Sequence, residues 1–363
     1  MLDSIKKIAV SMLTGACAMT SLLLVAVGFS DHIDPIGHPT LACLGLTFPF
    51  FIVANLVMLV VMLLFKWQRA WVPLLGFVFA YAPIRTYLPI HTRGEVPDSC
   101  IKVLSYNICG YGGNYKYENA VDTIANYLRR IDADIVCMQE EQYIGGGSNP
   151  LEVIKTIYPH NDTTVLTPPD VEYVNILGIH TRYPILRKER LPYTSECNGS
   201  VAYFLKVGPD TLIVINNHLE STHLSTDDRD RYKQVIKGDM ERQAAEEEAL
   251  HIIDQLGVGM SKRAVAANVV HQYVMDHSRY PIVVCGDFND TPISYARRTV
   301  SQSLTDCFVE SGCGLGLSFN QIGFTFRIDH IMCSDHFRPY NCTVDGEMDA
   351  SDHNPIFCWL KRQ

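Results

Sequence analysis

The chain has 363 residues, of which 47% are hydrophobic and 19% are charged. This composition excludes an intrinsically disordered or collagen-like protein. The formal net charge is −9, from 30 Lys and Arg against 39 Asp and Glu. Six of the basic residues and three of the acidic ones precede residue 94, so residues 94–363 hold 24 basic and 36 acidic residues, a net charge of −12. Such a region is a poor non-specific binder of polyanions, although a local basic groove is compatible with it.

Two long apolar segments lie in the first 93 residues. Residues 8–29 and 41–65 carry no charge over 22 and 25 residues, enough to cross a bilayer core of about 30 Å at about 1.5 Å per residue. Two such runs in tandem are hard to bury in a soluble domain, so we expect membrane spans. A cleaved signal peptide competes for the first run because Lys6 and Lys7 precede it, but the run is longer than a usual signal core.

A third apolar segment, at about residues 70–90, decides which side of the membrane the rest of the chain occupies. Pro73 and Pro83 interrupt it, so it is either a short third span or a re-entrant or interfacial segment. The positive-inside rule assigns the flanking basic residues to the cytoplasm: these are Lys6, Lys7, Lys66 and Arg69. Three spans then place residues 94–363 outside the cytoplasm, and two place them inside. We favour three.

The cysteines leave the compartment open. Ten of the twelve follow residue 93, and an exported domain could pair some of them. Four fall in expected buried strands, where cysteine commonly serves as a small apolar residue: Cys109, Cys137, Cys285 and Cys333. No CxxC pair with metal-ligand spacing occurs, so we expect no zinc site.

A polar linker at residues 92–99 precedes a region in which strand-like and helix-like segments mix without a regular βαβ repeat. Apolar runs predict strands at residues 101–108, 134–138, 174–180, 201–207, 212–218, 281–285, 327–333 and 355–360. Helices are expected at residues 118–131, 227–256 and 261–277, and a Gly-rich loop at 145–147. One α/β domain over residues 94–363 is compatible with this length.

Polar side chains cluster where these strands begin or end. The carboxylates among them are Glu140, Asp287, Asp329 and Asp352, and Asn107 and Asn289 add amide oxygens. An oxygen-rich set of this kind suits Mg²⁺, Mn²⁺ or Ca²⁺ better than zinc. Histidines beside such carboxylates indicate acid–base chemistry or the stabilisation of an anion. Attack of water on a phosphate ester is the chemistry that uses all of these groups.

The same motifs, in this order, resemble the endonuclease/exonuclease/phosphatase superfamily, whose fold is that of deoxyribonuclease I. The resemblance covers about residues 102–360 and rests on SYN at 105–107, QE at 139–140, GIHTRYPI at 178–185, NHL at 217–219, GDFNDTP at 286–292, IDHI at 328–331 and SDH at 351–353. It implies a four-layer α/β sandwich with two packed, mostly antiparallel sheets, here preceded by two or three transmembrane helices.

The resemblance also implies roles for individual residues. Glu140 would bind the metal with Asn107 beside it, and Asp352 would complete the metal shell. Asp287 would orient or deprotonate the attacking water, and Asn289 would hold the phosphate.

The resemblance implies roles for the histidines too. His353 would be the second acid–base group, oriented by Asp329, and His218 would contact a phosphoryl oxygen. His330 and His223 are read as structural or rim residues. For Arg182 the sequence leaves two roles open, a contact with the phosphate and a solvated loop residue.

The expected activity is therefore that of a membrane-anchored phosphoesterase that uses Mg²⁺, or Mn²⁺, on a phosphodiester or a phosphomonoester. The membrane anchor favours a lipid phosphate ester as the substrate. A surface-tethered nuclease remains the alternative, although the negative charge does not favour DNA or RNA. A non-catalytic binding domain is less expected, because every position of the motifs holds the expected residue type.

Overall fold

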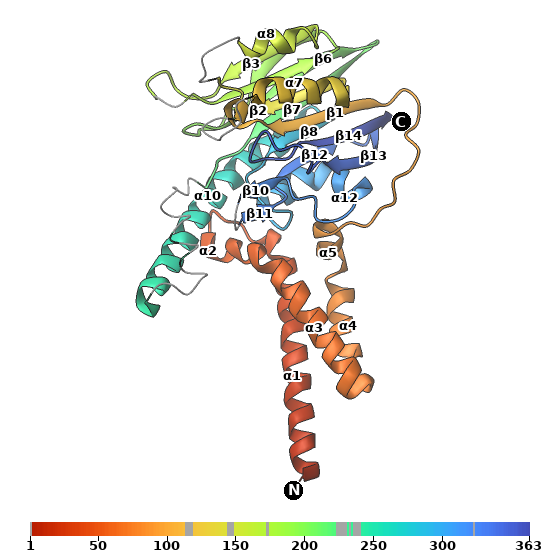
Figure 1. Cartoon of the computed structure of the whole chain (residues 1–363), viewed down its shortest axis with the longest axis vertical. Helices are drawn as coiled ribbons and strands as arrows, with labels where there is room; N and C mark the ends of the chain where they lie inside the picture. Colours follow the sequence, from red (N-terminus) through yellow and green to blue (C-terminus); the bar gives the residue numbers. More distant parts are fainter. Residues whose placement is uncertain are drawn as a thin grey trace.

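A computed structural model describes residues 2–112, 119–143, 149–171, 174–222, 231, 234, 241–321 and 324–363. The expected loop at 145–147 and His223 lie outside the described residues. A bundle of helices at the N-terminal end carries an α/β domain at its other end (Figure 1).

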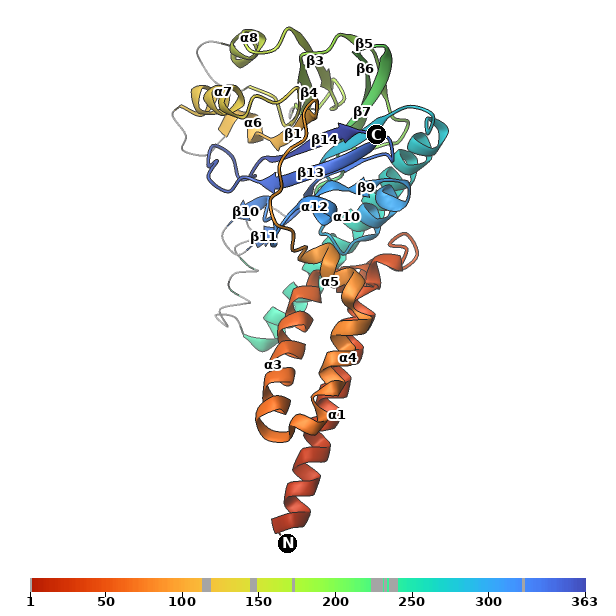
Figure 2. The same cartoon turned by 90° about the vertical axis from the view of Figure 1, so that its right-hand side faces the viewer.

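The bundle is formed by α1 (Leu2–Gly28), α3 (Phe48–Lys66) and the pair α4 (Trp71–Phe79) and α5 (Tyr81–Tyr87). Two stretches, Ser4–His32 and Pro39–Arg69, are long and apolar enough to cross a membrane. After the turn η3 (Trp67–Arg69), α4 and α5 run back beside α1 and α3 to the domain (Figure 2). Short helices connect α1 to α3: η1 (Ser30–His32), α2 (Pro39–Ala42) and η2 (Cys43–Thr47).

Polar groups inside the bundle join its helices. Ser21 Oγ donates a hydrogen bond to Asn55 Oδ1 at 2.9 Å, and Asn55 Nδ2 donates to the Pro73 carbonyl at 2.9 Å. Gly76 lets α4 approach closely, since a Cβ there would lie 2.8 Å from Ser21 Cβ. Small residues and interhelical hydrogen bonds of this kind are typical of helix packing in membranes.

The domain contains two six-stranded sheets and a two-stranded ribbon. The first sheet has the order β13-β14-β1-β2-β4-β3, with β1 (Ile101–Asn107), β2 (Ile135–Gln139), β3 (His160–Val165), β4 (Ile176–Thr181), β13 (Phe337–Val344) and β14 (Ile356–Arg362). The second has the order β5-β6-β7-β8-β12-β9, with β5 (Ile185–Arg190), β6 (Gly199–Val207), β7 (Asp210–His218), β8 (Ile282–Asp287), β9 (Thr305–Asp306) and β12 (Asp329–Cys333). The ribbon pairs β10 (Phe319–Gln321) with β11 (Phe324–Phe326). Among the described strands, β1–β2 and β7–β8 are parallel and the other pairs are antiparallel.

The apolar side chains form three layers of core around these sheets. One cluster, which includes Val103, Leu177 and Val214, fills the space between the two sheets. A second packs α7 (Ala120–Ile131) and α8 (Pro150–Lys155) on the outer face of the first sheet. A third packs α10 (Arg242–Asp276) and α11 (Tyr295–Val300) on the outer face of the second. The expected α/β fold with two packed sheets is confirmed. Other short helices within the described residues include α6 (Cys109–Gly112), η4 (Ser301–Ser303) and α12 (Cys307–Ser311).

The structure corrects two local expectations. The expected helices at 227–256 and 261–277 are helical where they are described, but they form one continuous helix from Arg242 onward, because Gly257 lies inside the helix and packs against Pro39. Residues 227–230, 232–233 and 235–240 of the first expected helix lie outside the described residues. A Cβ on Gly257 would lie 2.9 Å from Pro39 Cβ. Cys109 follows β1 and begins α6, where it is half-buried, instead of lying inside a strand.

The domain is docked on the bundle through several contacts. Ser261 Oγ on α10 donates to the Pro35 carbonyl at 2.7 Å. The buried Arg327 donates to the carbonyls of Thr86 and Tyr87 at the end of α5, at 2.5 and 3.4 Å. The first contact holds α10 against the segment between α1 and α3, and the second holds the domain against the end of α5.

Candidate active site

Strand register places three of the expected site residues side by side. The neighbouring strands β7, β8 and β12 align His218 with Asp287 and Asp287 with Asp329. Gly286 makes this approach feasible: its φ is 131°, and a Cβ there would lie 2.0 Å from the Asn217 carbonyl oxygen. All three side chains are buried. The second sheet alone therefore builds a row of two carboxylates and an imidazole.

His353 lies against this row. Its Nδ1 is 2.9 Å from Asp329 Oδ2, and its Nε2 is 3.7 Å from Asp287 Oδ2. Burial opposes the charged imidazolium, but the charges of Asp329 and Asp287 outweigh burial and raise the pKa of His353 to about 10. His353 is thus protonated at neutral pH, and Asp329 fixes the orientation of its ring.

His218 is the opposite case. Burial lowers its pKa despite the nearby Asp287, so the ring is neutral. Its Nδ1 is 2.9 Å from Asn175 Nδ2, and its Nε2 lies 3.7 Å from both Glu140 Oε1 and Asp287 Oδ2. Because the Asn175 amide donates to Nδ1, the single ring proton is assigned to Nε2. That proton points toward the carboxylates.

The first sheet contributes Asn107 and Glu140 from the ends of its parallel pair. Asn107 Nδ2 donates to Glu140 Oε1 and to Asp287 Oδ2, both at 3.1 Å. Asn289 donates from its backbone N–H to Asp287 Oδ1 at 2.7 Å, and from its side chain to the Leu219 carbonyl at 2.9 Å. Glu140 and Asn289 both have left-handed backbones, with φ of 53° and 52°. Strained conformations of this kind cluster at functional sites.

One cavity of about 460 Å³ exposes part of this cluster, and we call it the catalytic cavity. Five expected site residues line it: Glu140, Asp287, Asn289, Asp352 and His353. Asp352 accepts a hydrogen bond from Gln321 Nε2 at 2.8 Å. Asn107, His218 and Asp329 lie behind the lining and contact it through the distances above. All eight expected site residues therefore lie in or directly behind one cavity.

The donor set fits a hard divalent cation. Burial, and then the charge of Asp329, raise the pKa of Asp287 to about 6, which reflects a crowd of buried carboxylates. Asp329 Oδ1 is buried with no hydrogen-bond partner within the described part of the chain. Asp287 and Asp329 each offer a carboxylate oxygen within 4.8 Å of the other and of a His353 ring nitrogen, but His353, protonated beside Asp329, is not itself a ligand. Carboxylate and amide oxygens are the ligands that Mg²⁺ and Mn²⁺ prefer.

Two other sequence candidates lie elsewhere. The His330 ring packs on Phe288 with centroids 5.1 Å apart, on the face of β12 opposite to Asp329. Arg182 forms ion pairs with Asp132 and Asp134 and does not line the catalytic cavity.

The sequence reasoning missed several residues around the site. Asn175 holds His218, and as a polar residue directly before a strand it carried the same signal as the residues that were found. Arg263 is buried on α10 and donates from Nε to Asp290 Oδ2 at 3.1 Å, which fixes the loop after Asn289. It was missed because no local pattern distinguishes a buried arginine from an exposed one within a helix.

The sandwich of two sheets, with carboxylates, amides and two histidines in one cavity, brings together the groups that acid–base hydrolysis uses. Residues 104–353 match the model of the Endonuclease/Exonuclease/phosphatase family, and the chain belongs to that family. Residues 10–87 match a second model, described as a domain of unknown function. No curated protein matches the sequence.

Solved structures with a similar fold include three that cover nearly the whole domain. The human Nocturnin catalytic domain with a bound sulfate anion is 16% identical, with a TM-score of 0.51 over 74% of this chain and 96% of that one. TDP2 of D. rerio in complex with a single-strand DNA product is 15% identical, with a TM-score of 0.51 over 73% and 100%. A mannosyl-6-phosphatase of Bacteroides thetaiotaomicron is 17% identical, with a TM-score of 0.50 over 72% and 99%. At these identities the likeness shows a shared fold and no more.

Proposed function

We propose that the protein is a membrane-anchored phosphoesterase that requires Mg²⁺ or Mn²⁺ and hydrolyses a phosphodiester or phosphomonoester. The observation that carries this proposal is the convergence of Glu140, Asp287, Asp352 and His353 on one cavity. Membership of the family supports it. So do the names of the similar structures, which include a phosphatase of a sugar phosphate and a protein bound to a DNA product.

The bound cation would be held by Glu140 and Asp352, with Asn107 beside them, and would neutralise charge on a phosphoryl oxygen. Asp287 orients the attacking water and takes its proton while the water oxygen bonds to phosphorus. His353 gives a proton to the leaving oxygen as its bond to phosphorus breaks.

Two further groups hold the phosphate and the acid in place. Asn289 holds the phosphate, and His218 donates from Nε2 to a phosphoryl oxygen. Asp329 keeps His353 charged and oriented.

Residues 1–93 form the anchor and residues 94–363 the catalytic domain in this proposal. The two long apolar helical stretches support it, because only 17% of the most apolar 18 residues of each stretch is buried in the structure. A core helix of a soluble protein would be mostly buried. The hydrogen bond from Ser21 to the buried Asn55 supports an α1 that stays in the mature protein, because cleavage of α1 as a signal peptide would expose Asn55. The third span, about residues 70–90, corresponds to α4 and α5.

The test uses the full chain in lipid nanodiscs after treatment with a chelator. Hydrolysis of bis-p-nitrophenyl phosphate and p-nitrophenyl phosphate is measured with Mg²⁺, with Mn²⁺ and with excess EDTA. We expect activity to return with either metal. The Glu140→Gln variant should lose at least about 10²-fold in kcat/KM, because even outer-shell partners of metal ligands contribute about 10–100-fold.

The exposed Glu347, outside the cavity, provides the matched control, and Glu347→Gln should keep the wild-type rate. Full activity in EDTA, or a wild-type rate in Glu140→Gln, would contradict the proposal. A non-catalytic binding domain would give no hydrolysis with either metal.

A further inference from the structure

Two chemically different groups of residues line the catalytic cavity. Glu140, Asp287 and Asp352 are acidic. The apolar group includes Leu46, which lies in the segment that leads into α3, and three residues of α10: Ile252, Leu256 and Met260. The proposed anchor thus supplies part of the wall of the active-site cavity.

This apolar wall is a built part of the structure. Met260 packs in one cluster with Ala42 and Cys43, and Leu46 and Leu256 pack against that cluster. Gly257 lies directly against Pro39, and Ser261 donates to the Pro35 carbonyl. Helix α10 and the connection between α1 and α3 therefore close one side of the cavity together.

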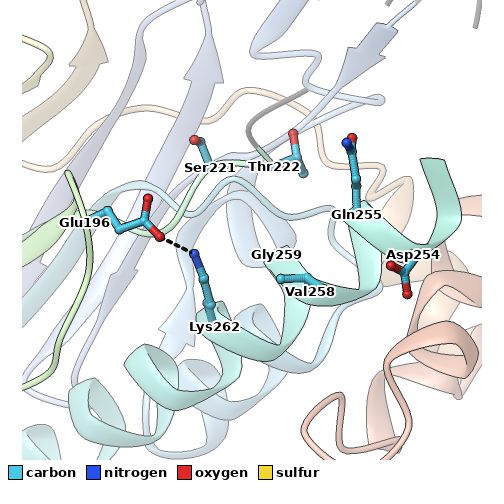
Figure 3. A pocket seen from close by; sticks show the side chains of 8 residues that line it. All are labelled: Glu196, Ser221, Thr222, Asp254, Gln255, Val258, Gly259 and Lys262. Carbon is cyan, nitrogen blue, oxygen red and sulfur yellow. Dashed lines mark hydrogen bonds and ion pairs between the residues drawn. The ribbon is translucent and has the colours of Figure 1, made fainter. Parts of the chain in front are cut away.

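One face of helix α10 lines the catalytic cavity with apolar side chains. Ile252, Leu256 and Met260 recur every four residues and so share one face of the helix. A neighbouring hollow of about 310 Å³ is lined by a different set of α10 residues, which includes Asp254, Gln255 and Lys262 (Figure 3). In it, Lys262 Nζ is bound to Glu196 at 3.0 Å. Asp254, Gln255 and Lys262 thus line the second hollow together with Val258, whereas Ile252, Leu256 and Met260 line the catalytic cavity together with the paired Arg263.

Aromatic side chains line the cavity beside the catalytic groups. Phe319 packs against the His353 ring with centroids 5.0 Å apart, and Phe326 and Ile328 also line the cavity. Apolar surface therefore reaches the catalytic imidazole itself.

The charges of the cavity do not suit a nucleic acid strand. Among the described residues that line it, the basic side chains are Arg263 and His353. Arg263 is paired with Asp290, and His353 with Asp329. A polyanionic strand is usually held by several lysines and arginines on its phosphates.

We propose that the substrate is an amphiphilic phosphate ester, with its phosphate beside the acidic and histidine groups of the cavity and a long hydrocarbon chain against Leu46, Leu256 and Met260. Burial of methylene groups against this wall would favour such a substrate over a short ester. The hydrocarbon chain would enter from the side of the cavity where the wall continues into α3, the second apolar helix of the bundle. This inference rests on the proposed phosphoesterase activity.

The test compares two diesters with the same leaving group, p-nitrophenyl decyl phosphate and p-nitrophenyl methyl phosphate. The full chain in phosphatidylcholine nanodiscs with Mg²⁺ hydrolyses both, and kcat/KM is measured for each. We expect the decyl ester to be preferred at least about tenfold, since one methylene in an apolar pocket can already contribute about that much. The half-buried wall residues are then changed in Leu46→Ser and Leu256→Ser, each of which should lower the decyl-to-methyl ratio at least about threefold.

Matched control variants distinguish a preference caused by the apolar wall from one caused by partitioning of the decyl ester into the bilayer. Leu44→Ser lies in the same segment as Leu46, and Leu250→Ser on the same helix as Leu256, and both side chains are exposed outside the cavity. These two variants should keep the wild-type ratio. Partitioning alone would leave all five proteins with the same ratio, which would overturn the proposal.

Other outcomes also decide the question. Equal metal-dependent hydrolysis of both esters would overturn the amphiphilic substrate but leave the phosphoesterase activity standing. Preferred hydrolysis of a single-stranded DNA oligonucleotide would overturn it in favour of a nuclease. If wild type and Glu140→Gln were equally inactive on every substrate, the proposed activity itself would fail, and this inference with it.

Discussion

His353 and His330 show how neighbouring strand positions divide chemistry from packing. Asp329 lies directly behind the cavity lining, where it holds His353, so the next residue on the strand, His330, points to the opposite face. There it packs on Phe288, and its Nδ1 is 3.9 Å from Asp306 Oδ2. A histidine that lies within a family motif can thus have a role in core packing and none in the chemistry.

The first prediction separates these histidines by kinetics. His353→Ala and His218→Ala should each lower kcat by at least about 10²-fold, the usual contribution of positioned acid–base groups. His330→Ala should cost far less in kcat but lower the melting temperature, because it opens a cavity against Phe288. Steady-state kinetics and thermal melts on the three variants measure this. A folded His330→Ala protein with a crippled kcat, beside a near-normal His353→Ala, would show that the roles are reversed.

The second prediction concerns acid stability. Burial, which outweighs the attraction of Asp306, lowers the pKa of His330 from 6.5 to about 4. Between these values the unfolded chain binds a proton that the folded chain does not, so the free energy of unfolding falls as the pH falls. This contribution is fully present above about pH 6.5 and is lost by about pH 4. The full loss is on the order of 3 kcal/mol.

The variant His330→Gln isolates this effect. The raised pKa of Asp287 acts in the opposite direction below pH 6, but it acts on both proteins equally. We therefore expect the stability difference between wild type and variant to shift in favour of the variant as the pH falls from 6.5 to 4. Chemical denaturation of both proteins across this range measures it. A difference that is independent of pH would contradict the neutral, buried state of His330.

At the scale of secondary-structure elements, the central strands of the two sheets could be predicted from the sequence, whereas the edge strands β3 and β5 could not. The strands β1, β2, β7 and β8 are continuous apolar runs, because they are buried on both faces. The edge strand β5 reads ILRKER and is mostly exposed, so its sequence carries no apolar run. The strand β3, HNDTTV, was missed for the same reason.

The same distinction applies to the site. Asn107, His218 and Asp287 end central strands and Glu140 directly follows one, and this position, together with their residue types and the family motifs, made them candidates. The pairing of His218 with Asn175 depends on how two strands from different sheets pack, which no local pattern encodes. The buried pair of Arg263 and Asp290 depends on contact between a helix and a distant loop in the same way.

The third prediction concerns the contact between α5 and the domain. The buried Arg327 guanidinium donates to the carbonyls of Thr86, Tyr87 and Leu315. Arg327→Met would leave these carbonyls unpaired, and each unpaired buried group costs about 1–3 kcal/mol. We expect a loss of stability of at least about 3 kcal/mol. Thermal unfolding of the full chain in detergent measures it.

Arg85 provides a matched control for this contact. It also joins α5 to the domain, through Glu310 at 2.7 Å, but both side chains are exposed. Arg85→Met should therefore cost less than about 1 kcal/mol. If both variants melted at the wild-type temperature, the buried contact would not contribute to docking.

At the scale of the whole molecule, the helix bundle and the α/β domain are joined by direct contacts in two places. The bundle ends in the wall of the catalytic cavity through Leu46, and the chain returns to the domain through α5 and the Arg327 contact. If the bundle is the proposed membrane anchor, these contacts fix the position of the active site relative to the bilayer. The side of the membrane that the domain occupies then follows from the topology of the bundle.

The last prediction is the sidedness. The turn between α3 and α4, with Lys66 and Arg69, lies at the end of the bundle away from the domain, as does the N-terminus (Figure 2). Residues 30–40, at the domain end, contain no Lys or Arg. The positive-inside rule then assigns the domain to the non-cytoplasmic side. A reporter fused after Gln363 should be active as alkaline phosphatase and dark as green fluorescent protein.

A fusion after Arg69 supplies the control, because it truncates the chain in the turn that should be cytoplasmic. It should show the reverse pattern, fluorescent and without phosphatase activity. The same pattern at both positions would mean that α4 and α5 do not cross the membrane. They are 9 and 7 residues long, so at about 1.5 Å per residue they reach across only by acting together. Cytoplasmic signals at both fusions would move the active site, and the search for its substrate, to the cytoplasmic leaflet.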